Sequence, residues 1–506
     1  GATGARARRY VAPGGRLLRR TGRSLRAMST VLVCLGGIVL STQSVHAETD
    51  ARNIPLNNEV IPPTFFGMHF RLDKIDWPGV PFGALRLWDT DTNWQRMNPE
   101  IGKYDFSVLD RYLAVAKNHQ LEDVMLTLGG TPQWASADPT DRSCDYSEFA
   151  PGSCHPPSDL NPDGSGTNHC WRDFLHALGT HLAGLNAQNH ASVKYFSVWN
   201  EFTRGAESHH PSWLGTDEQM WRMTADAGCI LLGRGVPGQR CTSTDMHEPA
   251  VGLLPFAKVT TPDAVSRGPR LRGFADSLQK NNATSSIEII AVHSYAYVTS
   301  GLTSPDTGPS GLPAQWSEIQ NILPTALHNL PIWSTESGWG DTVKNLPDQD
   351  LQQGYVARYY LVGWSLGFRR LYWYAGDNSW GRLIYPDGID GCHDKGPQKG
   401  CQTTAAYAWK QVYRWMVGNR MVRNCAAENS SSLWTCELAM RDGRRLLAVW
   451  DTAQSCSGGY CTASAYFYPK GFRSYFILSD DKCRPLPKKA IQIGWKPVLL
   501  CESCDE

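Results

Sequence analysis

Short apolar runs alternate with amphipathic stretches along most of this chain, and this alternation constrains the fold more than any other sequence feature. Seven runs of mostly apolar residues, each bounded by turn or polar residues, lie between residues 60 and 415: Phe65–Phe70, Ala84–Trp88, Val124–Leu128, Tyr195–Trp199, Ile287–Val292, Ile332–Thr335 and Leu371–Tyr374. Runs of this length are typical of strands that are buried on both faces of a parallel sheet.

Helical patterns lie between these runs. In Trp171–Leu185 the apolar residues recur at i, i+3, i+4 and i+7, which places them on one helical face, and Phe106–Asn118 repeats the pattern. With Ser243–Met246 as a weak eighth strand, the alternation predicts an α/β fold, a (β/α)₈ TIM barrel. A doubly wound parallel sheet is the alternative.

The pattern changes after a helix predicted at Thr403–Val417. Short period-2 runs divided by Gly, Asp and Ser follow, which is typical of an antiparallel sheet: Ser432–Met440, Arg445–Asp451, Ala463–Tyr468, Tyr475–Leu478 and Pro497–Leu500. We therefore expect a catalytic barrel over residues 48–420 and a β-sandwich-like module over residues 421–506. No low-complexity linker separates them, so the module is expected to pack on the barrel.

The first 47 residues have a different composition. They hold eight Arg and no Asp or Glu, and the apolar run Val31–Leu40 precedes Val45-His46-Ala47, a small-x-small cleavage pattern. This predicts a signal peptide over residues 1–47 and a secreted, periplasmic or extracellular protein. The run is too short to span a bilayer, so we expect no stable membrane insertion after signal removal; a membrane anchor is the alternative.

Removing this leader changes the charge balance. The full chain carries +1, whereas residues 48–506 hold 41 basic and 48 acidic residues, a net charge of −7. No basic patch is expected to remain, so a nucleic-acid partner is not predicted. If the substrate is an acidic glycan, its negative charges would have to pair with cations near the strand ends, such as Arg204 or Arg382. No phosphate-binding or dinucleotide-binding glycine loop follows a strand, so we expect no cofactor.

Cysteine usage agrees with export. Of 15 Cys, only Cys34 lies in the leader, and the other 14 lie in groups of two or three along the sequence, which predicts up to seven disulfides of open connectivity. A zinc site is the alternative for the first cluster, although its spacing fits no compact finger: Cys144, Cys154, His155, His169 and Cys170. We expect no bound metal.

Candidate catalytic residues follow two of the predicted strands. In a (β/α)₈ barrel the chemistry lies where the strands end, and the fourth strand ends in Asn200-Glu201 while the seventh ends in Thr335-Glu336-Ser337. Two glutamates on rigid strand ends can converge across the barrel mouth. Glycoside hydrolysis requires such a pair, one carboxylic acid to protonate the leaving oxygen and one carboxylate to attack the anomeric carbon.

These motifs resemble those of the clan A glycoside hydrolases. Within the clan, Trp199-Asn200-Glu201-Phe202 together with Thr335-Glu336-Ser337-Gly338-Trp339, and the trailing β-module, resemble glycoside hydrolase family 39, which includes β-xylosidases, α-L-iduronidases and bacterial exopolysaccharide hydrolases. The resemblance covers the architecture of about residues 60–500, with specific matches at the strand ends.

The resemblance implies a retaining double displacement. Glu201 would be the acid/base, Glu336 the nucleophile, and Asn200 would bind the sugar 2-hydroxyl. Arg86 would keep Glu336 ionised and Tyr295 would orient it.

Three further residues are implied as substrate contacts. His293 would lie near the acid/base or the sugar, Trp373 would form the aromatic floor of the sugar subsite, and His69 is a weaker candidate. Other tryptophans at strand ends or in the following loops are candidate sugar platforms: Trp88, Trp94, Trp134, Trp339 and Trp380.

We interpret the chain as a secreted retaining glycoside hydrolase acting on a polysaccharide or oligosaccharide. A catalytically silent glycan-binding protein on the same scaffold and a transglycosidase are the alternatives.

Overall fold

The computed structural model describes residues 54–503, apart from 145–148, 189–192, 236–251, 266, 297–303, 341–348, 387–399, 455, 458–459 and 479. The predicted signal peptide at 1–47 and the weak strand Ser243–Met246 lie outside the described residues. Residues 48–506 belong to one compact unit.

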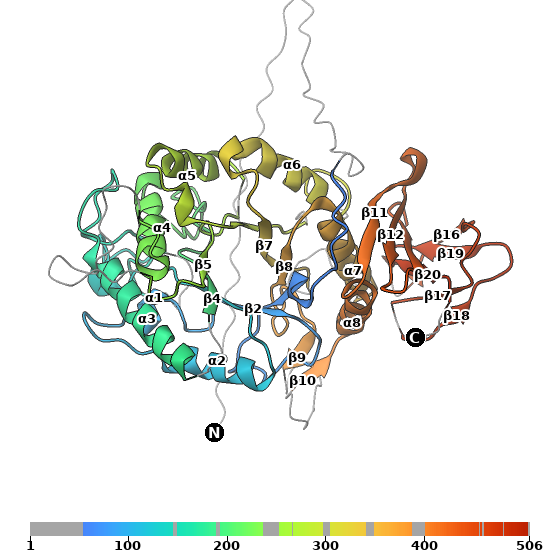
Figure 1. Ribbon diagram of the computed structural model, residues 1–506, viewed down its shortest axis with the longest axis horizontal. Helices are drawn as coiled ribbons and strands as arrows, with labels where there is room; N and C mark the ends of the chain where they lie inside the picture. The colour runs from blue at the N-terminus through green and yellow to red at the C-terminus, as the bar shows by residue number, and fades with distance from the viewer. Residues whose placement is uncertain are drawn as a thin grey trace, which may run out of the picture. The chain divides into compact units, whose positions relative to one another are not determined.

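Among the described residues, eight parallel strands form the central sheet (Figure 1): β1 Phe66–Met68, β2 Ala84–Leu87, β3 Val124–Thr127, β4 Val193–Ser197, β5 Lys258–Val259, β6 Ile290–His293, β7 Ile332–Ser337 and β8 Arg370–Trp373. Their order is β5-β4-β3-β2-β1-β8-β7-β6. Isolated parallel bridges join Thr260 to Ile289 and Ala264 to Val292, which connects the chain after β5 to β6 and closes the sheet. The predicted (β/α)₈ barrel is confirmed, and the doubly wound sheet is wrong.

The strands that the apolar runs predicted are buried along their length. Every residue of β2, β3, β6, β7 and β8 is buried, because helices cover the outside of the barrel and side chains fill its interior. Two strands differ: β4 has two half-buried residues, Lys194 and Tyr195, and the two residues of β5 include an exposed lysine, Lys258. A strand this short has no apolar run by which a sequence pattern would reveal it.

Helices follow most strands and surround the barrel (Figure 1): α1 Trp94–Met97, α2 Ser107–Asn118, α3 His169–Ala187, α4 Asp217–Leu232, α5 Pro269–Lys280, α6 Leu312–Ile322, α7 Gln349–Leu366 and α8 Thr404–Met416. The best defined start is that of α4, where Thr216 and Gln219 form a reciprocal capping box. Short 3₁₀ turns occur at Pro63–Phe65, Gln133–Ala135, Thr284–Ser286, Thr325–Leu327 and Glu428–Ser430.

The chain after α8 forms the predicted antiparallel module. A six-stranded sheet has the order β11-β12-β13-β20-β17-β18, from β11 Arg420–Ala427, β12 Leu433–Ala439, β13 Arg445–Asp451, β17 Ser474–Phe476, β18 Arg484–Pro485 and β20 Val498–Cys501. β16 Ala463–Tyr466 pairs with β19 Ile491–Gly494 and packs on the sheet through a small apolar core. A further strand pair of the module is β14 Cys456–Ser457 with β15 Tyr460–Cys461, and before α8 the chain forms the pair β9 Ile384–Pro386 with β10 Gly400–Gln402.

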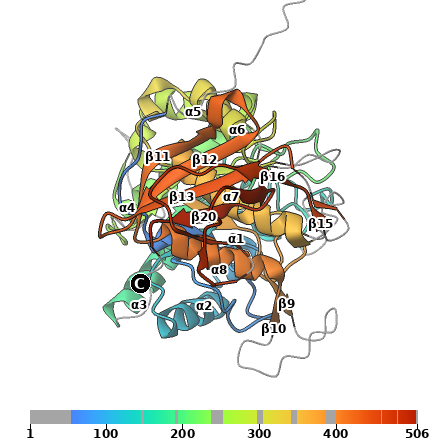
Figure 2. The same ribbon diagram turned by 90° about the vertical axis from the view of Figure 1, so that its right-hand side faces the viewer.

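This module packs against α7, and Figure 2 shows its sheet in front of α7 and α8. The Trp495 indole donates a hydrogen bond to the Leu351 carbonyl at 3.0 Å and lies 4.0 Å from the Arg358 guanidinium. Arg358 pairs with Asp306, which also accepts a hydrogen bond from the Trp450 indole. Buried contacts of this kind hold the module on the barrel.

Disulfides join Cys144 to Cys154 and Cys425 to Cys436, and Cys229, Cys401 and Cys483 are also disulfide-bonded. Cys170 and Cys501 are free thiols, so the predicted upper limit of seven disulfides is not reached. The Cys144–Cys154 disulfide contradicts the zinc alternative, because it removes two of the thiolates that a metal ion would need as ligands. Within the described part of the chain, no helix has the length and apolar character that crossing a bilayer requires.

Candidate active site

Arg86 is the centre of the polar network inside the barrel. β2 places its fully buried guanidinium among the ends of β4, β5 and β7. It donates to Glu336 Oε2 at 3.1 Å, to Asn200 Oδ1 at 2.8 Å and to Asp263 Oδ2 at 2.7 Å. The structure thus brings Arg86, Asn200 and Glu336 together, as the resemblance implied.

Asp263 is a site residue that the sequence analysis missed. Besides Arg86, its carboxylate accepts hydrogen bonds from Ser197 at 3.0 Å and Thr335 at 2.5 Å. Burial opposes the charge on Arg86, but Asp263 and Glu336 outweigh it and raise the arginine pKa. Asp263 follows the very short β5, so no apolar run marked the strand end at which it lies.

Glu336 is held by both of its carboxylate oxygens. Arg86 contacts Oε2, and the Tyr295 hydroxyl donates to Oε1 at 2.6 Å. Burial and the nearby Glu336 raise the pKa of Tyr295 well above 10, which keeps the hydroxyl protonated as a donor. The two donors fix the orientation of this carboxylate.

Glu201 lies at the end of β4 between two nitrogen donors. His293 Nδ1 is 3.0 Å from Oε1, and Arg204 donates to Oε2 at 2.7 Å. Burial raises the pKa of Glu201, but His293 and Arg204 outweigh it and lower the value to about 2. For His293, burial opposes the charged form, but Glu336 and Glu201 outweigh it and raise the pKa. The Glu201–His293 pair therefore holds a proton, mainly on the imidazole.

His293 also links the two carboxylates. One oxygen each of Glu201 and Glu336 and a ring nitrogen of His293 all lie within 4.8 Å of one another. Two carboxylates and an imidazole at such distances could hold a cation. Here the guanidinium groups of Arg86 and Arg204 already contact the carboxylates, and their charge opposes a metal ion. The arrangement favours proton transfer and nucleophilic attack.

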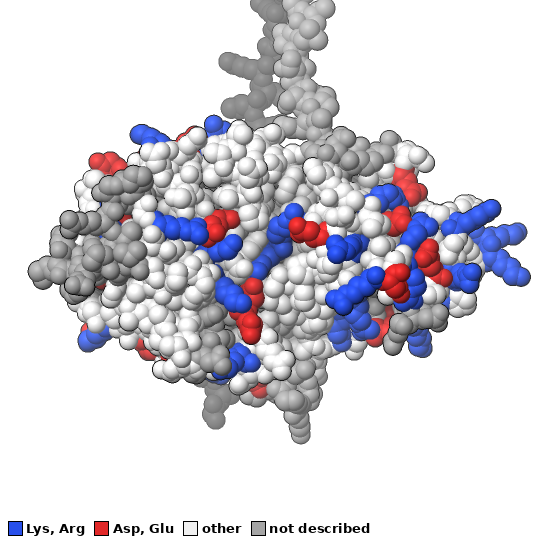
Figure 3. All heavy atoms as spheres, viewed as in Figure 1, with Lys and Arg blue, Asp and Glu red and all other residues white. Residues whose placement is uncertain are grey.

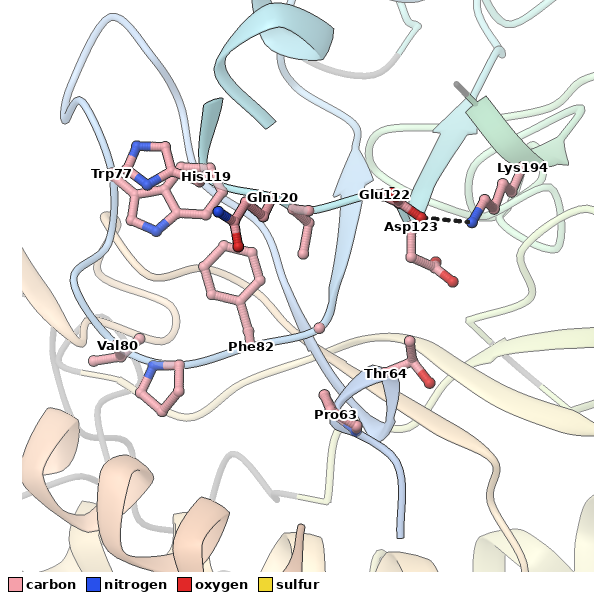
Figure 4. A pocket seen from close by; sticks show the side chains of 13 residues that line it. Pro63, Thr64, Trp77, Val80, Phe82, His119, Gln120, Glu122, Asp123 and Lys194 are labelled. Atoms are coloured by element: carbon pink, nitrogen blue, oxygen red, sulfur yellow. Dashed lines mark ion pairs between the residues drawn. The ribbon is translucent and has the colours of Figure 1, made fainter. Parts of the chain in front are cut away.

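A cavity of about 380 Å³ opens over these groups, lined by Trp88, Asp89, Asn200, Glu201, Arg204, Val265, Tyr295, Glu336, Tyr374 and Trp380. Four predicted site residues thus face it: Asn200, Glu201, Tyr295 and Glu336. A larger hollow of about 510 Å³ lies by the opposite, amino-terminal ends of the first strands, where Trp77 stacks on His119 at 3.9 Å and Lys194 faces Glu122 at 4.0 Å (Figure 4). None of the predicted site residues lines that hollow.

None of the three residues implied as further substrate contacts lines the cavity: His293 is buried against Glu201, and His69 and Trp373 are buried as well. His69 Nε2 is 3.1 Å from the Thr335 carbonyl oxygen, and burial together with the Arg86 charge lowers the pKa of His69 well below 6.5. The ring is therefore neutral and supports the strand ends. Trp373 is fully buried among Tyr355, Tyr359 and Trp409, so its expected role as the subsite floor needs correction.

Other aromatic rings line the cavity. Trp88 and Trp380, both candidate platforms, line the cavity, and Trp380 is 37% exposed. Trp94 and Trp339 are buried packing residues, and Trp134 donates its indole N–H to the Asn98 carbonyl.

Asp89 adds a third carboxyl group to the cavity. This residue was not among the site residues predicted from the sequence. It follows β2 with a left-handed backbone, φ 59°, and accepts a hydrogen bond from the Tyr374 hydroxyl. Burial raises the pKa of Asp89 to about 6; the Tyr374 hydrogen bond opposes the shift and the Glu336 charge adds to it. Its neighbour Trp88 could have drawn attention to this strand end.

No protein-family model matches the chain, and no curated protein matches its sequence. The closed barrel with glutamates at the ends of β4 and β7 has the fold of the clan A glycoside hydrolases.

Three solved structures illustrate this similarity. A family 39 glycoside hydrolase from the gut symbiont Bacteroides cellulosilyticus WH2 is 13% identical, with a TM-score of 0.56 over 88% of this chain and 82% of that one. A family 39 β-xylosidase from Caulobacter crescentus is 13% identical, with a TM-score of 0.52 over 88% and 97%. A conserved exported protein from Bacteroides fragilis is 12% identical, with a TM-score of 0.53 over 88% and 99%. At these identities the similarity establishes the fold.

Proposed function

We propose that this protein is an exported retaining glycoside hydrolase that cleaves O-glycosidic bonds in a polysaccharide or oligosaccharide. The observation that carries this is the closeness of Glu201 and Glu336, whose nearest oxygens lie within 4.8 Å in the cavity. Retaining enzymes hold their carboxyl groups about 5–5.5 Å apart, whereas inverting enzymes leave room for a water at about 6.5–9.5 Å.

Glu336 is the nucleophile in this proposal. Arg86 and Tyr295 donate hydrogen bonds to its two oxygens and fix its orientation, so one oxygen can attack the anomeric carbon and form a glycosyl-enzyme. Asn200 offers its amide N–H groups to the sugar 2-hydroxyl, because its carbonyl oxygen is already bound by Arg86.

Glu201 is the acid/base in this proposal, with His293 as the group that stores its proton. In the free enzyme the imidazole carries the proton, and Nδ1 lies 3.0 Å from the carboxylate that must deliver it. As the leaving oxygen gains negative charge, the proton passes from His293 through Glu201 to that oxygen. Glu201 then removes a proton from the water that cleaves the glycosyl-enzyme.

The test compares Glu336→Gln and Glu201→Gln with the unchanged protein on defined polysaccharides and aryl glycosides. Each variant should lose at least about 10³-fold in kcat.

Azide should restore turnover of aryl glycosides to alanine variants. If the substrate is a β-glycoside, Glu336→Ala should give the α-glycosyl azide and Glu201→Ala the β-glycosyl azide. Unchanged activity of Glu336→Gln contradicts the assignment. Binding without any cleavage by the unchanged protein indicates a glycan-binding protein, and products longer than the substrate indicate a transglycosidase.

A further inference from the structure

One end of the C-terminal module consists of two segments that run antiparallel to each other. Tyr466 of β16 pairs with Ile491 of β19, and further along, the Leu486 backbone N–H donates to the Arg473 carbonyl at 2.9 Å. Residues 466–473 and 486–491 therefore lie side by side.

These two segments carry four exposed cations, Lys470, Arg473, Lys488 and Lys489, which we call the basic patch. Neither segment contains Asp or Glu. Lys and Arg side chains gather at the end of the molecule that carries β16, β18 and β19 (Figure 3). No basic patch outside the leader is expected from the sequence, and the structure corrects this expectation, because the patch forms only when the two segments meet.

The acidic residues nearest in the sequence do not neutralise the patch. Asp480 and Asp481 precede β18, and their carboxylates pair with Arg484 at 2.6 Å and Arg414 at 2.9 Å. The positive charge of the patch is therefore available to a partner, although the chain without its leader carries −7.

An exposed aromatic ring lies in the same segment. Phe467 is 75% exposed, whereas the neighbouring side chains of Tyr466 and Phe472 are buried in the module core. Flat rings beside cations are suited to polymers that combine negative charges with sugar faces, since the ring stacks on the sugar while the cations meet the charges.

We propose that the basic patch and Phe467 bind an anionic polysaccharide, such as a polymer of uronic acids, and hold it on the module while the barrel acts on it. The choice of a polysaccharide rests on the proposed function. Charge complementarity supports an anionic polysaccharide. The rest of the chain is acidic and repels a polyanion, so the basic patch is the surface at which a polyanion would bind.

The test measures binding to polygalacturonate, with neutral dextran as the comparison, for two double variants. Lys488→Glu/Lys489→Glu alters the patch, and Arg111→Glu/Lys280→Glu alters two exposed cations of α2 and α5 by the same total charge. The patch variant should bind polygalacturonate at least about tenfold more weakly, and the control variant should stay within about twofold. Phe467→Ala should lose several-fold in affinity with an unchanged salt dependence, because it removes no charge.

Equal weakening by the two double variants overturns the proposal, as does tighter binding of single-stranded DNA or phosphatidylglycerol vesicles than of polygalacturonate. Glu336→Gln should bind polygalacturonate like the unchanged protein, so the patch is measured independently of turnover. If the protein cleaves no glycan while the patch variant alone loses polygalacturonate binding, the proposed hydrolase function fails and the patch proposal stands.

Discussion

The Arg204 guanidinium lies 2.7 Å from a carboxylate oxygen of Glu201, three residues earlier in the chain. This ion pair, together with the His293 contact, keeps Glu201 ionised in the free enzyme. In the proposed mechanism Glu201 must nevertheless be protonated when the leaving oxygen departs, so the charge on Arg204 should govern the pH range of the proposed activity.

Replacing Arg204 with Met should therefore move the alkaline limb of the kcat/KM profile upward. Loss of the cation favours retention of the proton that Glu201 and His293 share, so the pair should lose this proton at a pH higher by at least about one unit. The pH profile of kcat/KM measures this, with Arg272→Met as the control, since Arg272 pairs with Asp276 on the exposed face of α5. An unmoved alkaline limb would show that Arg204 does not set the protonation of Glu201.

Asp263→Asn should destabilise the fold and reduce activity. The substitution keeps the shape of the side chain but leaves the fully buried Arg86 with less compensating charge, which should cost about 3 kcal/mol of unfolding free energy. Asp276→Asn, at an exposed pair, should cost less than about 0.5 kcal/mol. Urea unfolding compares the two, and similar losses would contradict a compensating role for Asp263.

Asp89→Asn should stabilise the protein at neutral pH. The folded pKa of about 6 lies above the ordinary value, so ionised Asp89 destabilises the folded state above pH 6, and protonation removes this penalty as the pH falls toward 4. We expect a gain of up to about 3 kcal/mol at pH 7.5 that nearly vanishes at pH 4.0. Thermal unfolding at both values measures it; a pH-independent effect would argue against the raised pKa.

Gly354→Ala should loosen the module from the barrel. A Cβ at Gly354 would lie 2.2 Å from the Trp495 ring, so either α7 or the module must move, at a cost of about 2 kcal/mol. A Cβ at Gly184 in α3 would meet no atom within 4 Å, so Gly184→Ala should instead stabilise by about 0.5–1 kcal/mol. If Gly354→Ala left the thermal unfolding temperature unchanged, the Trp495 side chain must shift at little energetic cost, and the predicted loosening would be contradicted.

Much of the barrel was predictable because hydrophobic pattern is a local property. Buried parallel strands need continuous apolar runs, and the runs ending at Glu201 and Glu336 became β4 and β7. β5 was not predictable in this way. Its two residues gain their strand conformation from pairing with β4, so their own sequence carries no signal.

The candidate site shows the same division. Asn200, Glu201, Tyr295 and Glu336 follow predicted strands, and all four line the cavity. The direction of the Trp373 side chain was not readable, because an apolar ring at a strand end can face either the barrel mouth or the helices outside.

The sequence alone determined the alternation of strands and helices, the antiparallel module and the two strand ends that carry glutamates, since each depends on residues within one short segment. The tertiary structure decided which distant side chains meet. Asp263 reaches Arg86, His293 bridges two carboxylates, and two module segments bring four cations together. Electrostatic interactions act through space over a few ångströms, so their partners follow from packing and not from order along the chain.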